Sequence, residues 1–248
     1  MAAGRQRCPT SSHPRVRRSS SDARTAHVTN TKRQSPRSYE KAAKSECLIA
    51  MNYVGIDLAG SPKRPTGLCV TNDRLNTWCS VTYSDTEIVD AVRKSKARVA
   101  AIDAPLALPK ERHCLGEHCR GRAHFRTCDR VLMRMRIKFF PVTIGPMRTL
   151  TTRGISLKKK LERFDAQVVE TYPGASQDLL GFPRKQHDLE GLRKALVGIG
   201  CSGDVAARNL TGDELDAVSC ALVARDYAKG SYTAIGDPSE IMMILPRL

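Results

Sequence analysis

Five acidic residues stand at positions where folding would bring carboxylates together. Asp57 and Glu170 end short apolar runs, Asp103 lies inside another, and Asp213 with Asp216 opens an amphipathic stretch. A carboxylate at the tip of a buried strand is costly to desolvate unless a cation meets it. Several converging carboxylates repel one another strongly without a divalent cation, so the set indicates a two-metal site for phosphoryl transfer.

Three of these acids also have an ordinary structural interpretation. Asp213 can be a helix N-cap, Glu170 can form a surface ion pair, and Asp103 can cap the turn before Pro105. Asp57 is the hardest to explain in this way, because the residues on both sides of it are apolar. The order of the whole set, rather than any single acid, therefore carries the prediction.

The elements that must position these acids follow from the apolar periodicity of the chain. Five strands are predicted, at residues 53–58, 67–71, 77–83, 98–103 and 166–171. Helices are predicted at residues 85–96, with Asp85 as cap, and at 128–137, 147–164, 186–197 and 213–228, the third broken near Arg153 and Gly154. Three hairpin-connected strands followed by two crossover strands predict an α/β fold, a mixed five-stranded sheet with helices on both faces.

The predicted sheet brings three of the acids to one edge. The fourth strand carries Asp103 beside Asp57 if it runs parallel to the first, and the fifth strand adds Glu170 next to it. Ligand sites in open α/β sheets lie at the carboxyl ends of parallel strands. Asp213 and Asp216 are three residues apart, so they share one face near the start of the last predicted helix.

The chain of 248 residues carries 41 Lys and Arg against 25 Asp and Glu, a formal charge of +16. This excess favours nucleic acid or another polyanion as the partner, although a basic protein without such a ligand has the same composition. No run approaches the roughly 18 apolar residues that span a membrane, and no secretory signal is visible. Nine cysteines at irregular spacing are typical of reduced thiols, so we expect a cytoplasmic protein.

The first fifty residues differ from the rest of the chain. Residues 1–48 hold eleven Lys and Arg against three acids, and almost no aliphatic side chains. Such a segment cannot bury enough apolar surface to order itself, so a disordered basic tail at 1–50 is predicted before a single domain at 51–248. The tail is a basic arm for nucleic acid, an organelle transit peptide, or translated sequence upstream of an alternative start at Met51.

A second group of chemically active side chains lies in the segment 112–128. It contains three thiols and three imidazoles, those of Cys114, Cys119, Cys128, His113, His118 and His124. Zinc prefers four such ligands, but the spacing contains no CxxC pair and several arginines stand nearby. We therefore expect a loop of reduced thiols that faces a phosphate-bearing substrate, rather than Zn²⁺ on Cys114, Cys119 and Cys128.

Six segments of the chain carry a resemblance to a known family. They are Gly55-Ile-Asp-Leu-Ala-Gly60, Ile102-Asp-Ala-Pro105, Pro141-Val-Thr-Ile-Gly-Pro-Met147, Glu170-Thr-Tyr-Pro-Gly-Ala-Ser176, Asp213-Glu-Leu-Asp-Ala217 and Ile235-Gly-Asp-Pro238. In this order they resemble domain-of-unknown-function family 429 (DUF429), regarded as a predicted RNase H-like nuclease group, over roughly residues 52–246. The chain departs from the expected pattern at Gly212, where a polar residue, often His, is expected.

The resemblance implies an RNase H-like fold and a metal-dependent nuclease that hydrolyses phosphodiester bonds of DNA or RNA. Carried onto this sequence, it implies catalytic metal ligands at Asp57, Asp103, Glu170 and Asp216, with Asp213 as a further ligand. Two Mg²⁺ or Mn²⁺ ions would serve this chemistry. Candidates for contacts with backbone phosphates are Lys63, Arg148 and Arg153.

Two other functions compete with the nuclease. A catalytically degenerate RNase H-like domain would bind nucleic acid or act as a scaffold without cleaving it. An actin-like phosphotransferase also presents an Asp before a Gly-containing turn, but it needs a second, duplicated sheet, for which about 200 residues leave no room. Metal-dependent cleavage of labelled nucleic acid would distinguish the nuclease from the degenerate domain.

Overall fold

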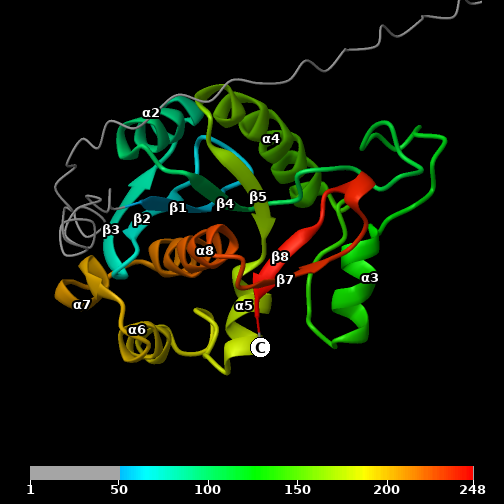
Figure 1. Ribbon diagram of the computed structural model, residues 1–248. Coiled ribbons are helices and arrows are strands. Elements are labelled where there is room, and N and C mark those ends of the chain that lie inside the picture. Colours follow the sequence, from blue (N-terminus) through cyan, green and yellow to red (C-terminus); the bar gives the residue numbers. More distant parts are fainter. Residues whose placement is uncertain (1–50, 248) are drawn as a thin grey trace, which may run out of the picture. The chain divides into compact units, whose positions relative to one another are not determined.

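Eight strands form one mixed sheet in the computed structural model, which describes residues 51–247 (Figure 1). Their order across the sheet is β6-β3-β2-β1-β4-β5-β8-β7. The strands are β1 (Asn52–Asp57), β2 (Thr66–Asn72), β3 (Asn76–Thr82), β4 (Val99–Asp103), β5 (Gln167–Thr171), β6 (Ser202–Gly203), β7 (Tyr232–Ile235) and β8 (Met243–Pro246). The tail predicted at residues 1–50 lies outside the described residues.

The five predicted strands form the centre of this sheet, and the α/β class with a mixed sheet is confirmed. β1, β2 and β3 pair antiparallel in sequence, while β4 runs parallel to β1 and β5 parallel to β4. The predicted number of strands is wrong, because β6 extends one edge of the sheet and β8 with β7 the other. These strands are two to four residues long, too short for an alternating pattern to be recognised.

Helices cover both faces of the sheet, as predicted (Figure 1). They are α2 (Asp85–Ser95), α3 (Thr127–Arg134), α4 (Gly145–Leu161), α5 (Pro173–Leu180), α6 (Leu189–Gly198), α7 (Asp204–Ala207) and α8 (Gly212–Ala228). On one face, Ile88 of α2 and Leu157 of α4 pack against Ile56 and Ile102 of the sheet. On the other face, α8 packs on β1 and β2.

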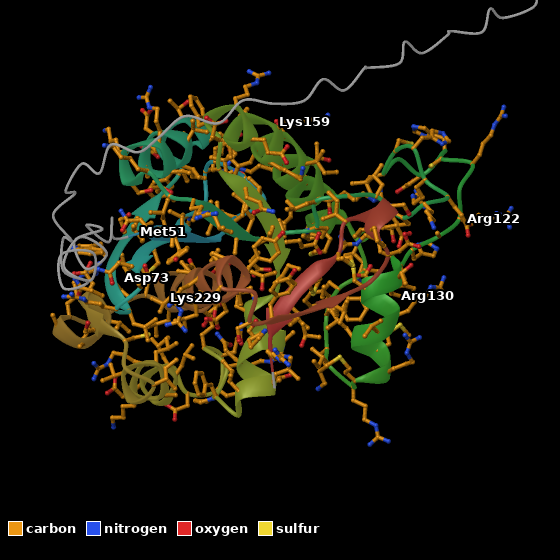
Figure 2. The ribbon with its side chains drawn as sticks, in the orientation of Figure 1. Met51, Asp73, Arg122, Arg130, Lys159 and Lys229 are labelled. Atoms are coloured by element: carbon orange, nitrogen blue, oxygen red, sulfur yellow. The ribbon has the colours of Figure 1, made fainter. Side chains whose placement is uncertain are left out.

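The surface of the described domain carries many basic side chains; Figure 2 shows those of Arg130 on α3 and Lys159 on α4 projecting outward. None of its helices is both long enough and apolar enough to cross a membrane.

The N-cap residues of two helices precede the acids considered for this role in the sequence. Ser84 rather than Asp85 is the N-cap of α2, and Thr211 rather than Asp213 is the N-cap of α8. In both, the cap hydroxyl accepts a hydrogen bond from the N–H of a glutamate three residues later, whose side chain accepts one from the cap residue in return. Asp213 is therefore free of the capping role.

The helix α4 runs unbroken through Arg153 and Gly154, contrary to the predicted break. A Cβ atom on Gly154 would lie 2.9 Å from Cβ of Ala104 and 3.1 Å from the carbonyl oxygen of Pro105. The glycine thus lets α4 lie close to the chain that follows Asp103. This packing offsets the helix propensity that a glycine loses, about 1 kcal/mol relative to alanine.

Candidate active site

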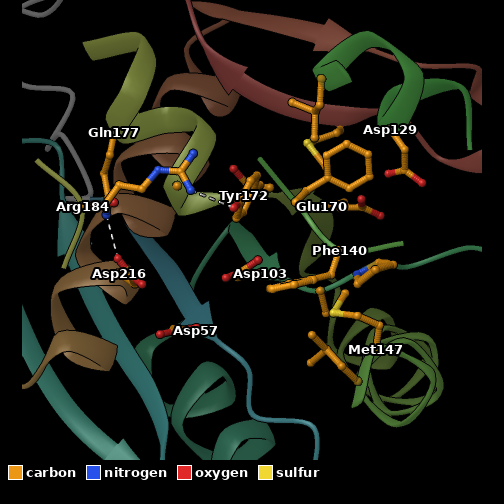
Figure 3. A pocket seen from close by; sticks show the side chains of 18 of the residues that line it. Asp57, Asp103, Asp129, Phe140, Met147, Glu170, Tyr172, Gln177, Arg184 and Asp216 are labelled. Atoms are coloured by element: carbon orange, nitrogen blue, oxygen red, sulfur yellow. Dashed lines mark hydrogen bonds between the residues drawn. The ribbon is translucent and has the colours of Figure 1, made fainter. Parts of the chain in front are cut away.

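Asp57 and Asp103 meet at the ends of two neighbouring parallel strands. They are register partners in the β1–β4 pair, so their side chains project from the same face of the sheet. Figure 3 shows both carboxylates pointing into one pocket. The structure thus brings these two acids together in the way that the strand order led us to expect.

Two glycines allow α8 to lie directly on the sheet beside these acids. A Cβ atom on Gly55 of β1 would lie 2.0 Å from the carbonyl oxygen of Ala217, and one on Gly67 of β2 would lie 1.9 Å from that of Asp213. A residue with a side chain at either strand position would collide with the helix backbone. The first turns of α8 therefore carry Asp213 and Asp216 to the end of β1.

A lysine that the sequence analysis did not single out lies among these acids, which we call the carboxylate cluster: Asp57, Asp103, Asp213 and Asp216. Nζ of Lys185 lies 2.9 Å from Oδ2 of Asp57. It also lies 2.8 Å from Oδ1 of Asp213 and 2.8 Å from Oδ2 of Asp216. Burial opposes the charge of Lys185, but the Asp57 and Asp216 carboxylates outweigh burial and hold its pKa well above the usual range.

The stem of Lys185 fills the space beside Gly212. A Cβ atom on Gly212 would lie only 2.8 Å from Cδ of the lysine, so a polar side chain at this position would require Lys185 to shift. Lys185 lies in the loop 181–188 between α5 and α6, far from Asp57 in the chain, and apolar periodicity says nothing about such a loop. The signal that could have found it is the need of buried acids for a cation.

The acids of the carboxylate cluster differ in how many hydrogen-bond donors they have. Nε2 of Gln177 on α5 donates to Oδ1 of Asp216 at 2.6 Å, so both oxygens of Asp216 have partners. No side chain or N–H group of the described residues donates to the Asp103 carboxylate. Burial, and next the charges of Asp57 and Asp216, raise the pKa of Asp103 well above its usual range. Burial also raises the pKa of Asp57 to about 7, although Lys185 opposes this.

Glu170 lines the same pocket but is held elsewhere. It is the register partner of Ile102, so it projects from the opposite face of the sheet to Asp103. Nη1 and Nη2 of Arg126 donate to its two carboxylate oxygens at 2.7 Å and 2.6 Å, and the N–H of Leu106 donates to Oε2 at 2.7 Å. Contrary to our expectation of a shared metal site, the structure does not bring Glu170 to the carboxylate cluster.

The partner of Glu170 belongs to a buried ion-pair network, formed by Arg126, Asp129 and Glu170. Nη2 of Arg126 lies 3.2 Å from Oδ1 of Asp129, and the side chains of Arg126 and Glu170 are each 1% exposed. Figure 3 shows Asp129 and Glu170 near each other and apart from Asp57. Within residues 51–247, no three carboxylates have oxygens that all lie within 4.8 Å of one another.

The pocket between the two groups has a volume of about 260 Å³. Phe139, Phe140, Met147 and Leu150 supply an apolar wall opposite the acids. Arg184, from the same loop as Lys185, also lines it. Its guanidinium lies 5.6 Å from the centre of the Tyr172 ring and donates to the phenol oxygen at 3.1 Å. The pocket thus combines cations, acids and an apolar surface.

The three predicted phosphate contacts have different surroundings. Lys63 is exposed in the loop after β1. Arg148 is partly exposed on α4 and lies 3.3 Å from Glu117. Arg153 is buried, and its three nitrogens donate to Asp85 and to two backbone carbonyls at 2.6–2.8 Å. Arg153 therefore links α4 to α2 and to the loop after β1, and with its side chain only 7% exposed it offers little surface to a phosphate.

The three cysteines weighed as zinc ligands do not come together. Cys128 is fully buried at the start of α3, with its sulfur 3.6 Å from Oδ1 of Asp129. Cys114 and Cys119 lie instead beside His113, in the loop between β4 and α3.

A comparison with protein families gives one match to this chain. The model of a family described as "Protein of unknown function (DUF429)" matches residues 55–241, a range that contains the whole carboxylate cluster and Lys185. No curated protein matches the chain.

Proposed function

The chain belongs to the DUF429 family, and we propose that its carboxylate cluster serves a metal-dependent nuclease that hydrolyses phosphodiester bonds of DNA or RNA. The observation that carries this proposal is the excess of negative charge at the ends of β1 and β4. Four carboxylates gather there, and within the described chain Lys185 is the cation that contacts three of them. Such a cluster lowers stability unless a further cation binds.

The donor set suits Mg²⁺ or Mn²⁺, because both ions prefer carboxylate oxygens. Asp57 and Asp103 would hold the ion, since they are adjacent and no donor of the described residues competes for Asp103. Lys185 already balances charge beside Asp213 and Asp216, so the arrangement supports one ion, and the second ion stays a prediction. A bound ion would lower the pKa of an attacking water and offset the charge of a leaving oxygen.

The side chains around the cluster support a phosphate-bearing substrate. Lys185 places a positive charge beside Asp57. Arg184 is held by the Asp178 carboxylate and by Tyr172, and it lines the same pocket with two N–H groups left for an anionic oxygen. The apolar wall with Phe140 and Met147 suits a sugar or base and limits the access of water. Near neutral pH Asp57 holds a proton for part of the time, and binding of a cation would displace it.

The topology and charge of the chain support the same proposal. The central order β3-β2-β1-β4-β5, antiparallel up to β1 and parallel beyond it, supports the RNase H-like arrangement that the resemblance implies. In that interpretation β6, β7 and β8 are additions at the edges. The formal charge of +16 supports a polyanion such as nucleic acid as the partner.

The test is cleavage of end-labelled single- and double-stranded DNA and RNA by the full chain. We expect cleavage of at least one substrate with Mg²⁺ or Mn²⁺ and none with EDTA. Asp103→Asn should lower the rate on the order of a hundredfold or more, because it removes a metal-holding charge. Asp90→Asn makes the same change on the exposed face of α2 and should leave the rate unchanged. An unaffected Asp103→Asn variant would exclude the cluster from the reaction.

A second candidate, a non-cleaving nucleic-acid-binding protein, is favoured by one observation. The ammonium of Lys185 stands where a second cation would otherwise balance Asp57, Asp213 and Asp216. A protein of this kind would bind the labelled nucleic acids equally well with Mg²⁺ and with EDTA, and would cleave none of them.

A further inference from the structure

The chain between β4 and α3, residues 104–126, contains no helix or strand. Figure 1 shows part of this segment extending away from the sheet, and Figure 2 labels Arg122 on it. Within residues 111–124 the one buried residue is Cys119. An apolar core therefore does not hold this loop. Long loops without secondary structure are uncommon in compact domains and usually serve a function.

Polar contacts nevertheless fold the loop back on itself. The guanidinium of Arg112 donates to the carbonyl oxygens of Cys114, Gly116 and Ala123 at 3.1 Å, 3.0 Å and 3.3 Å. Gly121 lies against the chain before Arg112, where a Cβ atom would be 1.7 Å from a backbone oxygen. These contacts close the loop around Cys119 and require a glycine at position 121.

Three potential metal ligands face one another inside this loop. One ring nitrogen of His113 and the sulfurs of Cys114 and Cys119 all lie within 4.8 Å of one another. Ligand atoms around a tetrahedral Zn²⁺ ion are about 3.3–3.8 Å apart, given bond lengths of about 2.0–2.3 Å. The three side chains therefore need to close in only slightly to bind such an ion.

A further imidazole, that of His118, lies beside Gly116 but outside this group of three. A Cβ atom on that glycine would lie 3.1 Å from Nε2 of His118 and 3.7 Å from the sulfur of Cys114. The imidazole and the thiol thus share the space above this glycine. We propose that residues 113–119 bind one Zn²⁺ ion through His113, Cys114 and Cys119, with His118 as the fourth ligand. The donors are two sulfurs and two nitrogens, a set that zinc prefers over magnesium or calcium.

This zinc site is structural, because the protein supplies all four ligands. It differs from the set first weighed from the sequence, since His113 and His118 replace Cys128. The loop that it closes is joined to α4 through Glu117 and Arg148, 3.3 Å apart. The ion would thereby fix the segment that leads from Asp103 on β4 to the buried Arg126.

The test measures metal binding by the full chain purified with reductant. We expect about one Zn²⁺ per chain, and on replacement with Co²⁺ an absorption band from sulfur-to-cobalt charge transfer, which oxygen ligands do not give. Cys114→Ser and Cys119→Ser should abolish the band, and His113→Gln should weaken binding at least about tenfold. His187→Gln, an exposed histidine of another loop, and Asp103→Asn should leave zinc content and band unchanged.

A measurement on the unaltered protein guards against variants that fail to fold. Bound Zn²⁺ should protect Cys114 and Cys119, but not thiols elsewhere, from alkylation when the peptides are mapped by mass spectrometry. Addition of an organomercurial should release the zinc. The proposal is overturned if the chain binds neither Zn²⁺ nor Co²⁺, if alkylation ignores zinc, or if Cys114 and Cys119 are found joined as a disulfide in the protein purified with reductant.

Discussion

The carboxylate cluster and the buried ion-pair network line one pocket, yet their charges are met in different ways. In the network, Arg126 donates to both Glu170 and Asp129, and backbone N–H groups donate to the same carboxylates. In the cluster, three of the four carboxylates contact the ammonium of Lys185, and the fourth, that of Asp103, has no donor in the described chain. An acid at a strand end therefore reveals little by itself; the two groups differ in whether a cation and N–H donors match the charge of each acid.

The largest effect on stability is expected from a substitution in the buried ion-pair network. Arg126→Met would leave Glu170 buried without its cation, so the free energy of unfolding should fall by about 3–5 kcal/mol in urea titrations. Adding Glu170→Gln removes the stranded charge and should recover at least half of that loss. If the two losses simply add, the pair is not coupled and the network does not balance these charges.

A smaller loss of stability is expected from a substitution in the carboxylate cluster. Lys185→Met should lower the free energy of unfolding by about 1–3 kcal/mol, because the lysine is 22% exposed and the acids can take up protons instead. Saturating Mg²⁺ should reduce this loss, since a bound cation would replace the missing charge. Lys194→Met on α6, where the side chain is 72% exposed, serves as the control. A loss that is the same with and without Mg²⁺ would contradict a cation site here.

The two groups should also separate by pH. The pKa of Asp57 is about 7 in the folded protein against 3.8 ordinarily, so between these values the folded state binds more protons than the unfolded state. Its contribution to stability is therefore fully present below about pH 4 and is lost as the pH rises through 7. Asp216→Asn removes one of the charges that raise this pKa and should flatten the decline in metal-free buffer. An equal decline in the variant, followed by thermal unfolding, would show that Asp216 does not act on Asp57.

The smallest effect is expected outside both groups. Lys63 is exposed in the loop after β1, so Lys63→Ala should leave the melting temperature unchanged. If Lys63 contacts a phosphate, the variant should weaken binding to all nucleic-acid sequences and reduce the salt dependence by about one ion. Unaltered salt dependence, measured by fluorescence anisotropy, would assign Lys63 to the solvated surface.

The sequence predicted the positions of the acids better than their partners. Asp57 and Asp103 stand at the ends of apolar runs, and strand order alone makes them neighbours. The strand that carries Glu170 was predicted as well. The register of that strand, however, places the Glu170 side chain on the other face of the sheet, where Arg126 donates hydrogen bonds to it. Lys185 comes from a loop without periodicity. Contacts between segments far apart in the chain depend on register and loop path, which local patterns do not encode.

Two glycines also stood out in the sequence, but the sequence did not show why a glycine is needed at each position. Gly154 looks like a helix break in the sequence, yet it allows close packing of α4 against Ala104. Gly212 looks like a departure from the expected pattern, yet it makes room for Lys185. In both cases the neighbour that explains the glycine lies elsewhere in the chain, so composition and propensity could not identify it.

The close contact of Gly55 on β1 with Ala217 on α8 also has a consequence for the order of folding. It joins the first strand of the domain to its last helix, and contacts of such long sequence separation form late and slowly. During synthesis, Asp57 and Asp103 leave the ribosome well before α8, so their mutual repulsion is met before Asp216 and its helix arrive. The acidic site should therefore be assembled among the last events of folding, on a sheet in which β1 to β5 are already paired.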